Sequence, residues 1–429
     1  MMTKSKESWK SVAYVPHFIE PVLRSERDEV AHQIVPSREV RLRQSGFIDM
    51  ACVQKHSEHH IDRVPPQLVM TPPADANVTG HPKSYWISAG EQEIRALLKV
   101  EHAVVRMEIE SKIAEKPGTS RHIQPHILAD SLRRLVRRGE VATNTDATRG
   151  GRDIVTFSLS KPSVSKRLVE RAAARKRLLQ TRYLQWATGT AGLGRHTGIV
   201  GPSLEKSLHA SILTSAPYLG YRMLNPVSGE VSTVWDFDAT SFGSPDNGFL
   251  WHDADTNSDH LCLVEAKNTR EWIYPWGSEL YQLLFKCAHI YPEALRRGYG
   301  VIPVLVCRKA SPTLYYAAKD LGFHVAEVGK QLVDFGLEVG SDEDRMVNEV
   351  RAELGFTDIL DHNGTYRTIE KQFKSVIPGR ALEITQQFAE VGQELESDFR
   401  LLRVDGNTQT KYRAMKANAE SLGAEISWW

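Results

Sequence analysis

The chain has 429 residues, of which 41% are hydrophobic and 25% are charged, and its mean hydropathy is −0.36. These values are typical of a soluble globular protein with two or three compact units, and they exclude wholesale disorder. No segment reaches the roughly 18 consecutive apolar residues that a membrane-spanning helix needs, and no apolar stretch of the secretory type follows the N-terminus. The formal net charge of +1 gives no overall sign of a nucleic-acid-binding protein.

The cysteines lie far apart in the sequence, and none belongs to a CxxC pair. They are Cys52, Cys262, Cys287 and Cys307. This spacing indicates neither a zinc ribbon nor a redox motif. We therefore expect reduced thiols in a cytoplasmic protein that has no membrane segment.

Residues 1–90 contain scattered prolines and no sustained hydrophobic period. Such a pattern predicts short strands and loops rather than a regular domain. We expect an irregular N-terminal region whose role the sequence does not indicate.

Helical patterns begin near residue 91. The clearest predicted helix runs from Pro125 to Gly139, because proline suits the first turn of a helix and glycine suits its C-terminus. Its apolar stripe consists of Leu128, Leu132, Leu135 and Val136. The arginines that project off this stripe are Arg133, Arg134, Arg137 and Arg138. Two short strand-like segments follow, around residues 140–143 and 153–159.

Three helices followed by a two-stranded ribbon resemble the winged helix-turn-helix fold, over about residues 91–160. The resemblance implies that the third helix enters the major groove of DNA and that the ribbon touches the DNA backbone. The four arginines of that helix are then nucleic-acid-binding candidates. The alternative is an exposed charged face on a structural module.

The next segment, residues 161–199, is predicted to be a basic linker helix. Between Lys161 and Arg182, eight lysines and arginines accompany a single acid, Glu170. This stripe either follows a phosphate backbone or forms the solvated face of a connector, and charge alone leaves both readings open. The candidates for phosphate contacts are Lys166, Arg167, Arg171 and Arg175.

From residue 200 the sequence predicts a helix that ends before Pro217 and then three strands, at residues 219–224, 231–242 and 260–267. The third strand is apolar until it ends in Glu265-Ala266-Lys267. Because side chains alternate along a strand, these two charged residues share one face. Burying either charge without a partner is costly, so the strand end indicates a functional use for the charges.

A neighbouring strand that brings Asp236 or Asp238 alongside completes a set of two carboxylates and one ammonium. Oxygen ligands of this kind suit a divalent metal ion. Hydrolysis of a phosphodiester needs such a metal ion on the scissile phosphate, together with a cationic group that offsets the charge of the transition state.

This ordered set resembles the PD-(D/E)xK nuclease superfamily, over about residues 200–335. In that superfamily an αβββαβ core carries an aspartate on the second strand and Glu-x-Lys on the third. The resemblance implies a restriction-endonuclease-like fold, Mg²⁺ as the working ion and Mn²⁺ as a substitute.

The resemblance also implies roles for individual side chains. Asp238 and Glu265 correspond to metal ligands, and Asp236 is the alternative ligand to Asp238. Lys267 corresponds to the catalytic lysine. Glu205, on the first helix, corresponds to an accessory acid.

The sequence after the third strand fits the same pattern. Gln282 lies on the next predicted helix, where many family members place a glutamine. Four residues later the chain has Lys286, where RecB-like members often have a tyrosine. Strands at residues 301–307 and 323–328, separated by a helix at 311–321, complete a mixed α/β sheet.

The remaining segment, residues 339–429, reads as amphipathic helices with no apparent chemistry. These helices could cover the nuclease core, form a contact in a homodimer or with another protein, or contact DNA, and the sequence leaves these alternatives open.

We expect an α/β (α+β) multidomain protein with an αβββαβ core, an N-terminal winged helix and a helical C-terminal region. The expected segments are residues 1–90, 91–160, 161–199, 200–338 and 339–429. The expected function is a metal-dependent endonuclease that hydrolyses DNA, with RNA left open, in restriction, phage defence or repair. The alternative is a non-enzymatic DNA-binding or regulatory protein that uses a nuclease-like fold as a scaffold.

Overall fold

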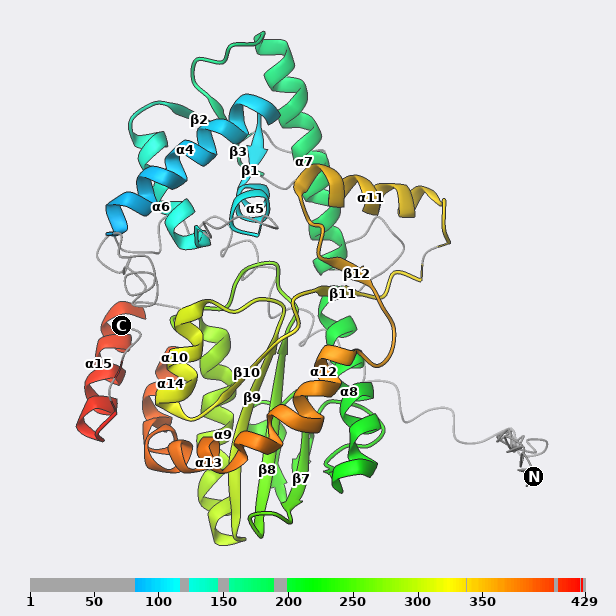
Figure 1. Ribbon diagram of the computed structural model, residues 1–429, viewed down its shortest axis with the longest axis vertical. Coiled ribbons are helices and arrows are strands. Elements are labelled where there is room, and N and C mark those ends of the chain that lie inside the picture. Colours follow the sequence, from blue (N-terminus) through cyan, green and yellow to red (C-terminus); the bar gives the residue numbers. More distant parts are fainter. Residues whose placement is uncertain are drawn as a thin grey trace, which may run out of the picture. The chain divides into compact units, whose positions relative to one another are not determined.

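The computed structural model describes most of the chain after residue 81. The described residues are 82–115, 123–145, 154–188, 199–336, 338–404, 408–424 and 426. They combine helices with four β-sheets, which confirms the mixed α/β class (Figure 1). Most of the N-terminal segment expected to be irregular lies outside the described residues. No helix in the described ranges is both long and apolar enough to cross a membrane.

The first group of elements forms an N-terminal module, residues 82–160. In chain order these elements are α4 (Lys83–Glu101), β1 (Val104–Val105), α5 (Arg106–Ile109) with the π-helix Glu110–Ala114, α6 (Pro125–Arg137), β2 (Val141–Asn144) and β3 (Thr156–Leu159). The strands form an antiparallel sheet in the order β1-β3-β2. Three helices followed by an antiparallel ribbon were expected here, and the structure has them.

Helix α4 starts eight residues before the residue at which the helical pattern was predicted to begin. Its first turns bury Trp86 and Ile87, so tertiary packing extends the helix towards the N-terminus. On α6 the predicted stripe is buried: Leu128, Leu132 and Leu135 are at most 3% exposed. The amphipathic period of α6 therefore sets which side of the helix meets the module's core.

A central five-stranded sheet organises the rest of the chain, in the order β10-β9-β8-β7-β4 (Figure 1). Its strands are β4 (Arg222–Met223), β7 (Asn247–Asp253), β8 (Ser258–Lys267), β9 (Tyr299–Cys307) and β10 (His324–Glu327). Strands β4, β7 and β8 pair antiparallel, whereas β8, β9 and β10 pair parallel. Strand β8 therefore has a hydrogen-bonded neighbour along both edges.

Helices cover both faces of this sheet. On one face α8 (Val200–Leu219) packs on Cys262 and Val264 of β8. On the other face α9 (Ser278–Arg296) packs on Leu261 and Leu263, together with α10 (Pro312–Leu321). Alternation along β8 therefore decides which residues at the strand end face α9.

The second predicted strand is wrong in position. Residues 231–242 form a small hairpin of β5 (Thr233–Val234) and β6 (Phe237–Asp238), followed by a short 3₁₀ helix. Phe237 and Asp238 are exposed, whereas Val231, Val234, Ala239 and Phe242 are buried in the cluster around α9. The run therefore packs on the core without adding a strand to the central sheet. The strand that pairs with β8 is β7, whose seven residues are all buried except His252.

The helix before the sheet was predicted to end before Pro217, but α8 continues to Leu219. Pro217 falls in the last turn of α8, where the loss of one backbone hydrogen bond is tolerated. Gly220, with φ of 68°, then ends the helix in the left-handed conformation.

The C-terminal region is part of the same packing. Its helices are α11 (Asp342–Leu354), α12 (Arg367–Lys371) with the π-helix Gln372–Val376, α13 (Ala381–Glu390), α14 (Glu396–Leu402) and α15 (Thr408–Ser421). Phe388, Phe399 and Tyr412 are at most 1% exposed and join the cluster around α9. Among the alternatives for this region, the structure therefore shows helices that cover the core. A parallel pair, β11 (Gln331–Val333) with β12 (Ile359–Asp361), was not predicted.

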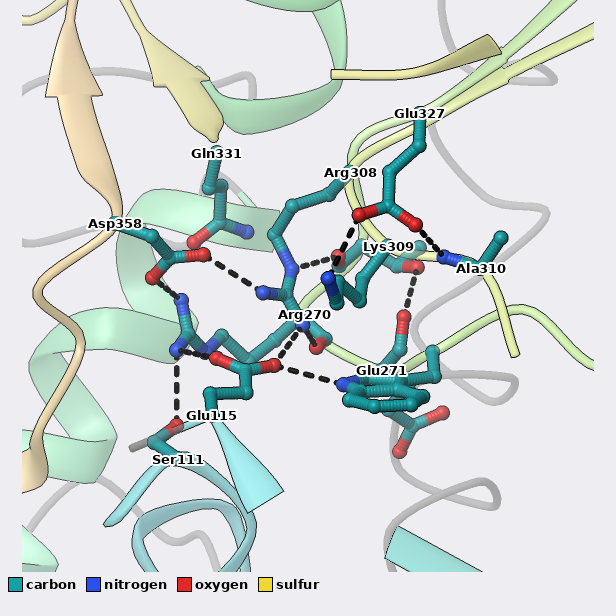
Figure 2. A network of polar contacts seen from close by, with 12 residues as sticks. Ser111, Glu115, Arg270, Glu271, Arg308, Lys309, Ala310, Glu327, Gln331 and Asp358 are labelled. Atoms are coloured by element: carbon teal, nitrogen blue, oxygen red, sulfur yellow. Dashed lines mark hydrogen bonds and ion pairs between the residues drawn. The ribbon is translucent and has the colours of Figure 1, made fainter. Parts of the chain in front are cut away.

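Two buried arginines join the module to the sheet (Figure 2). Arg270 follows β8, Arg308 follows β9, and their guanidinium groups lie between Glu115 of the module and Asp358 before β12. Glu115 accepts from both arginines at 2.7 Å. Burial acts against ionised Asp358, but the two arginines hold its pKa below the usual range. Each buried charge in this network is thus opposed by charges of the other sign.

Another buried polar group, His324 on β10, makes stability depend on pH. Its Nε2 lies 3.0 Å from Gln372 Oε1, and burial lowers the pKa of the imidazole to about 4. The unfolded chain, with a histidine pKa near 6.5, therefore binds more protons than the fold between about pH 6.5 and pH 4. The stability that neutral His324 supports is present above this window and is lost as pH falls through it.

We predict that His324→Gln reduces the loss of unfolding free energy between pH 7 and pH 5 by about 2 kcal/mol. The measurement is urea unfolding of both proteins at the two pH values. Equal losses in the wild type and the variant would contradict the assignment.

Candidate active site at the end of strand β8

The candidate site is built around Glu265, a buried carboxylate two residues before the end of β8. Its side chain is 4% exposed, and its Oε1 accepts from Lys267 Nζ at 2.9 Å. Lys267 Nζ also lies 3.3 Å from Gln282 Oε1 on α9. The predicted Glu-x-Lys pair and the predicted glutamine therefore meet, as strand alternation and the helix position required.

A second ammonium contacts the same carboxylate. Lys286 Nζ, one helical turn after Gln282, donates to Glu265 Oε2 at 2.7 Å and to the backbone oxygen of Ser244 at 3.0 Å. Burial acts against ionised Glu265, but Lys267 and Lys286 lower its pKa below the usual range. Glu265 is therefore ionised at neutral pH. The i, i+4 spacing from Gln282 was the sequence signal for this contact.

Lys267 is charged as well. Burial alone would lower the pKa of its ammonium, but Glu265 and Asp246 raise that pKa above the usual value. A lysine held in this way is a fixed positive charge and a hydrogen-bond donor at neutral pH. It is suited to stabilising or orienting an anion and is poorly suited to accepting a proton.

The acid that sequence reasoning missed is Asp246, in the loop just before β7. Its Oδ2 accepts from the backbone N–H of Ala266 at 2.7 Å, so it lies beside the Glu265–Lys267 segment. Burial raises its pKa to about 7, the charge of Glu265 adds to this, and Lys267 opposes it. The signal was Ser244-Pro245-Asp246 directly before an apolar run.

Glu205, the predicted accessory acid on α8, belongs to the same electrostatic group. Partial desolvation raises the pKa of its carboxyl, Lys267 opposes this effect and Glu265 adds to it. The side chain has an exposed surface, unlike Glu265. Glu205 therefore forms the solvent-accessible side of the acidic group.

The structure does not bring Asp236 or Asp238 to this group. Asp236 is 88% exposed and pairs with Arg297 Nη2 at 2.9 Å, just after the end of α9. Lys286 and Arg297 are separated by about 16 Å along α9, at 1.5 Å per residue. Asp238 lies on the exposed hairpin and accepts from the Thr240 N–H at 2.9 Å, which caps a 3₁₀ turn. The acid that the structure brings beside Glu265 and Lys267 is Asp246.

The donor set at this site is small. In the described ranges no three His, Cys, Asp or Glu side chains are arranged to hold a metal ion. Mg²⁺, however, is commonly held by one or two carboxylates together with waters and substrate oxygens. Asp246 and Glu265 fit that requirement, because Asp246 is bonded to the backbone of Ala266, the residue next to Glu265. Burial and the charge of Glu265 act against ionised Asp246, and a cation would favour it. Both Glu265 oxygens already contact lysines, so a cation there shares this carboxylate with them.

The predicted nucleic-acid contacts divide into two groups. Arg133 pairs with Asp130, Arg138 with Glu91 and Glu140, and Arg175 with Glu349 and Glu353. These three arginines are used within the protein. Five others have exposed side chains: Arg134, Arg137, Lys166, Arg167 and Arg171. Of these, Lys166 lies 3.7 Å from Glu170 on the solvent side of its helix.

Helix α7 (Lys166–Thr188) also has a structural role that sequence reasoning missed. Lys176, on its inner side, is 4% exposed and donates to Glu101, Glu108 and the backbone oxygen of Glu353. The predicted basic stripe is therefore divided between a structural face and a solvated face.

Comparison of this chain with protein-family models, with curated proteins and with solved structures returned no match.

We predict that Asp246→Asn stabilises the metal-free protein. The raised pKa means that the fold disfavours the ionised carboxylate, so the cost of Asp246 grows as pH rises from about 4 to about 7 and is complete above that. The gain in unfolding free energy should be greater at pH 8 than at pH 5 by about 3 kcal/mol. Urea unfolding in EDTA measures it.

The matched control is Asp255→Asn, an exposed acid in the turn between β7 and β8, which should change stability little. If Asp246→Asn instead destabilises the protein by the same amount at both pH values, the fold does not disfavour the ionised form of Asp246.

Proposed function

We propose that the protein is a metal-dependent nuclease that hydrolyses phosphodiester bonds of DNA. The observation that carries the proposal is that half-buried Asp246 and buried Glu265 lie beside the charged Lys267, at the end of a central strand. Two carboxylates and one ammonium are the groups that metal-assisted phosphodiester hydrolysis needs.

In this proposal Asp246 and Glu265 hold the metal ion. The ion would polarise the scissile phosphate and lower the pKa of a bound water. Lys267, kept protonated by its carboxylate neighbours, stabilises the negative charge that grows on the phosphate. Gln282 keeps the Lys267 ammonium in place by accepting from it.

The order of elements supports the resemblance to the PD-(D/E)xK superfamily. Helix α8, strands β4, β7 and β8, helix α9 and strand β9 follow one another as in an αβββαβ core, with the β5–β6 hairpin inserted. Pro245-Asp246 and Glu265-Ala266-Lys267 also give the motif its letters in order. Asp246 thereby replaces Asp238 as the proposed first metal ligand.

A second candidate function is a non-enzymatic DNA-binding or regulatory protein. The observation that favours it is the occupancy of both Glu265 oxygens by lysines, because a scaffold needs neutralised charges and no metal. A cleavage assay with both DNA and RNA substrates decides whether the site cleaves and which nucleic acid it prefers.

We predict metal-dependent cleavage that requires Asp246. Supercoiled, linear, single-stranded and branched DNA, with an RNA control, are incubated with protein in Mg²⁺, Mn²⁺ or EDTA. Asp246→Asn, Glu265→Gln and Lys267→Met should each reduce the rate about 100-fold or more, since each removes a charge used in the transition state.

The matched controls are Asp236→Asn and Asp238→Asn, which should cleave at the wild-type rate. Loss of cleavage in Asp238→Asn with full activity in Asp246→Asn would move the metal site to the hairpin. Binding without cleavage of any substrate would favour the regulatory protein.

For the N-terminal module we propose contact with the phosphate backbone of DNA. Arg134 and Arg137 support this, because they are the exposed arginines of α6, whereas Arg133 and Arg138 are neutralised by nearby acids. Exposed arginines on one helix can contact phosphates without loss of internal ion pairs.

We predict that Arg134→Glu with Arg137→Glu weakens DNA binding at least about tenfold at low salt and flattens the salt dependence, since fewer counterions are released. Fluorescence anisotropy with labelled duplex measures both effects. Arg400→Glu with Arg413→Glu, an equal charge change at exposed C-terminal positions, is the control. Equal weakening by the two pairs would show a general charge effect and no role for α6.

A further inference from the structure

Lys286 connects the two segments that carry the proposed metal ligands. Its ammonium donates to Glu265 Oε2 at 2.7 Å and to the backbone oxygen of Ser244 at 3.0 Å. Ser244 lies two residues before Asp246, which is itself bonded to the backbone N–H of Ala266. One buried lysine on α9 therefore ties the end of β8 to the loop before β7.

The loop is shaped to receive this lysine. Gly243 has φ of 101°, a conformation that glycine adopts readily. A Cβ at this position would lie 3.2 Å from Lys286 Cε, so the backbone of the loop packs directly on the lysine stem. The residue as a whole is 7% exposed. This close packing fixes the Lys286 side chain in the site, in contrast to a flexible lysine on the protein surface.

The two lysines on Glu265 differ in what else they contact. Lys267 is also held by Gln282, whereas the other partner of Lys286 is the backbone oxygen of Ser244.

A divalent cation held by Asp246 and Glu265 adds two positive charges to a group that already contains the ammoniums of Lys267 and Lys286. Repulsion between the cation and a buried ammonium lowers the affinity for the cation, because the low-polarity surroundings screen charges weakly.

We propose that Lys286 is a built-in counter-cation of the metal site. In the free protein it neutralises Glu265 and holds the Asp246 loop, and it competes with the divalent cation for Glu265. It thereby sets the cation concentration at which the site fills. This inference rests on the proposed function, since it presupposes that Asp246 and Glu265 bind a metal ion.

The test is Mn²⁺ binding to the full chain at pH 8, followed by electron paramagnetic resonance of free Mn²⁺ and by isothermal titration calorimetry. Lys286→Met, which removes the charge and keeps the stem, should lower the Kd at least tenfold. Lys286→Arg should keep the Kd within about threefold of the wild type, since the positive charge stays. The control is Lys374→Met, which should leave the Kd unchanged. Lys374 lies on the π-helix after α12 and pairs with Glu370 of α12.

The outcomes separate the inference from the proposed function. Wild-type protein that binds no Mn²⁺ would overturn both. Wild-type binding with equal or weaker binding by Lys286→Met would overturn the role of Lys286 and leave the metal site standing.

Removal of a buried cation beside Glu265 can also unfold the protein, so thermal unfolding is measured with and without Mn²⁺. Lys286→Gln, which can still donate to Ser244, provides the second variant. Mn²⁺ should raise the Tm of both variants more than that of the wild type, because the ion replaces the missing charge. Variants that stay unfolded in Mn²⁺ would overturn the proposal.

Discussion

The buried carboxylate of Glu265 is the constraint on which the rest of this structure depends. An ionised carboxylate buried at the end of a central strand is tolerated only when opposite charges and hydrogen bonds surround it. Here Lys267 comes from the same strand and Lys286 from the helix that covers that face. The position of α9 on the sheet, and of the loop that packs on Lys286, are therefore tied to this one charge.

A second buried network ties the N-terminal module to the same strand end. Arg270, three residues after Lys267, bonds Glu115 of the module and Asp358 of the C-terminal region. Arg308, at the end of the neighbouring strand, contacts the same two acids (Figure 2). Each guanidinium donates to both acids, so the two arginines and the two acids hold one another in a defined geometry. The proposed DNA-binding module and the proposed catalytic strand thus share one set of rigid contacts.

The sequence was informative wherever a local period decided the outcome. Strand alternation placed Glu265 and Lys267 on one face, and the amphipathic period of α6 identified its buried stripe. Gln282 joined the site as the family resemblance implied. The mixed α/β class followed from the alternation of helices and strands.

What the sequence could not supply depends on contacts between distant residues. Asp246 lies in a loop with no period, so an acid on a strand-like run was chosen in its place. That run, residues 231–242, forms a separate hairpin because the position beside β8 is filled by the more apolar β7. Lys286 could be seen as a departure from a motif, but its partner carbonyl at Ser244 lies 42 residues away. The pairing of Arg138 with Glu91 and of Arg175 with Glu353 was hidden for the same reason.

The proposed function requires that Asp246 and Glu265 together bind a divalent metal ion. The most direct test is X-ray diffraction from crystals grown with Mn²⁺, with data collected at the manganese absorption edge. We expect an anomalous peak about 2 Å from carboxylate oxygens of both Asp246 and Glu265. A peak at the Asp236–Asp238 hairpin, or no peak near Glu265 at saturating Mn²⁺, would contradict it.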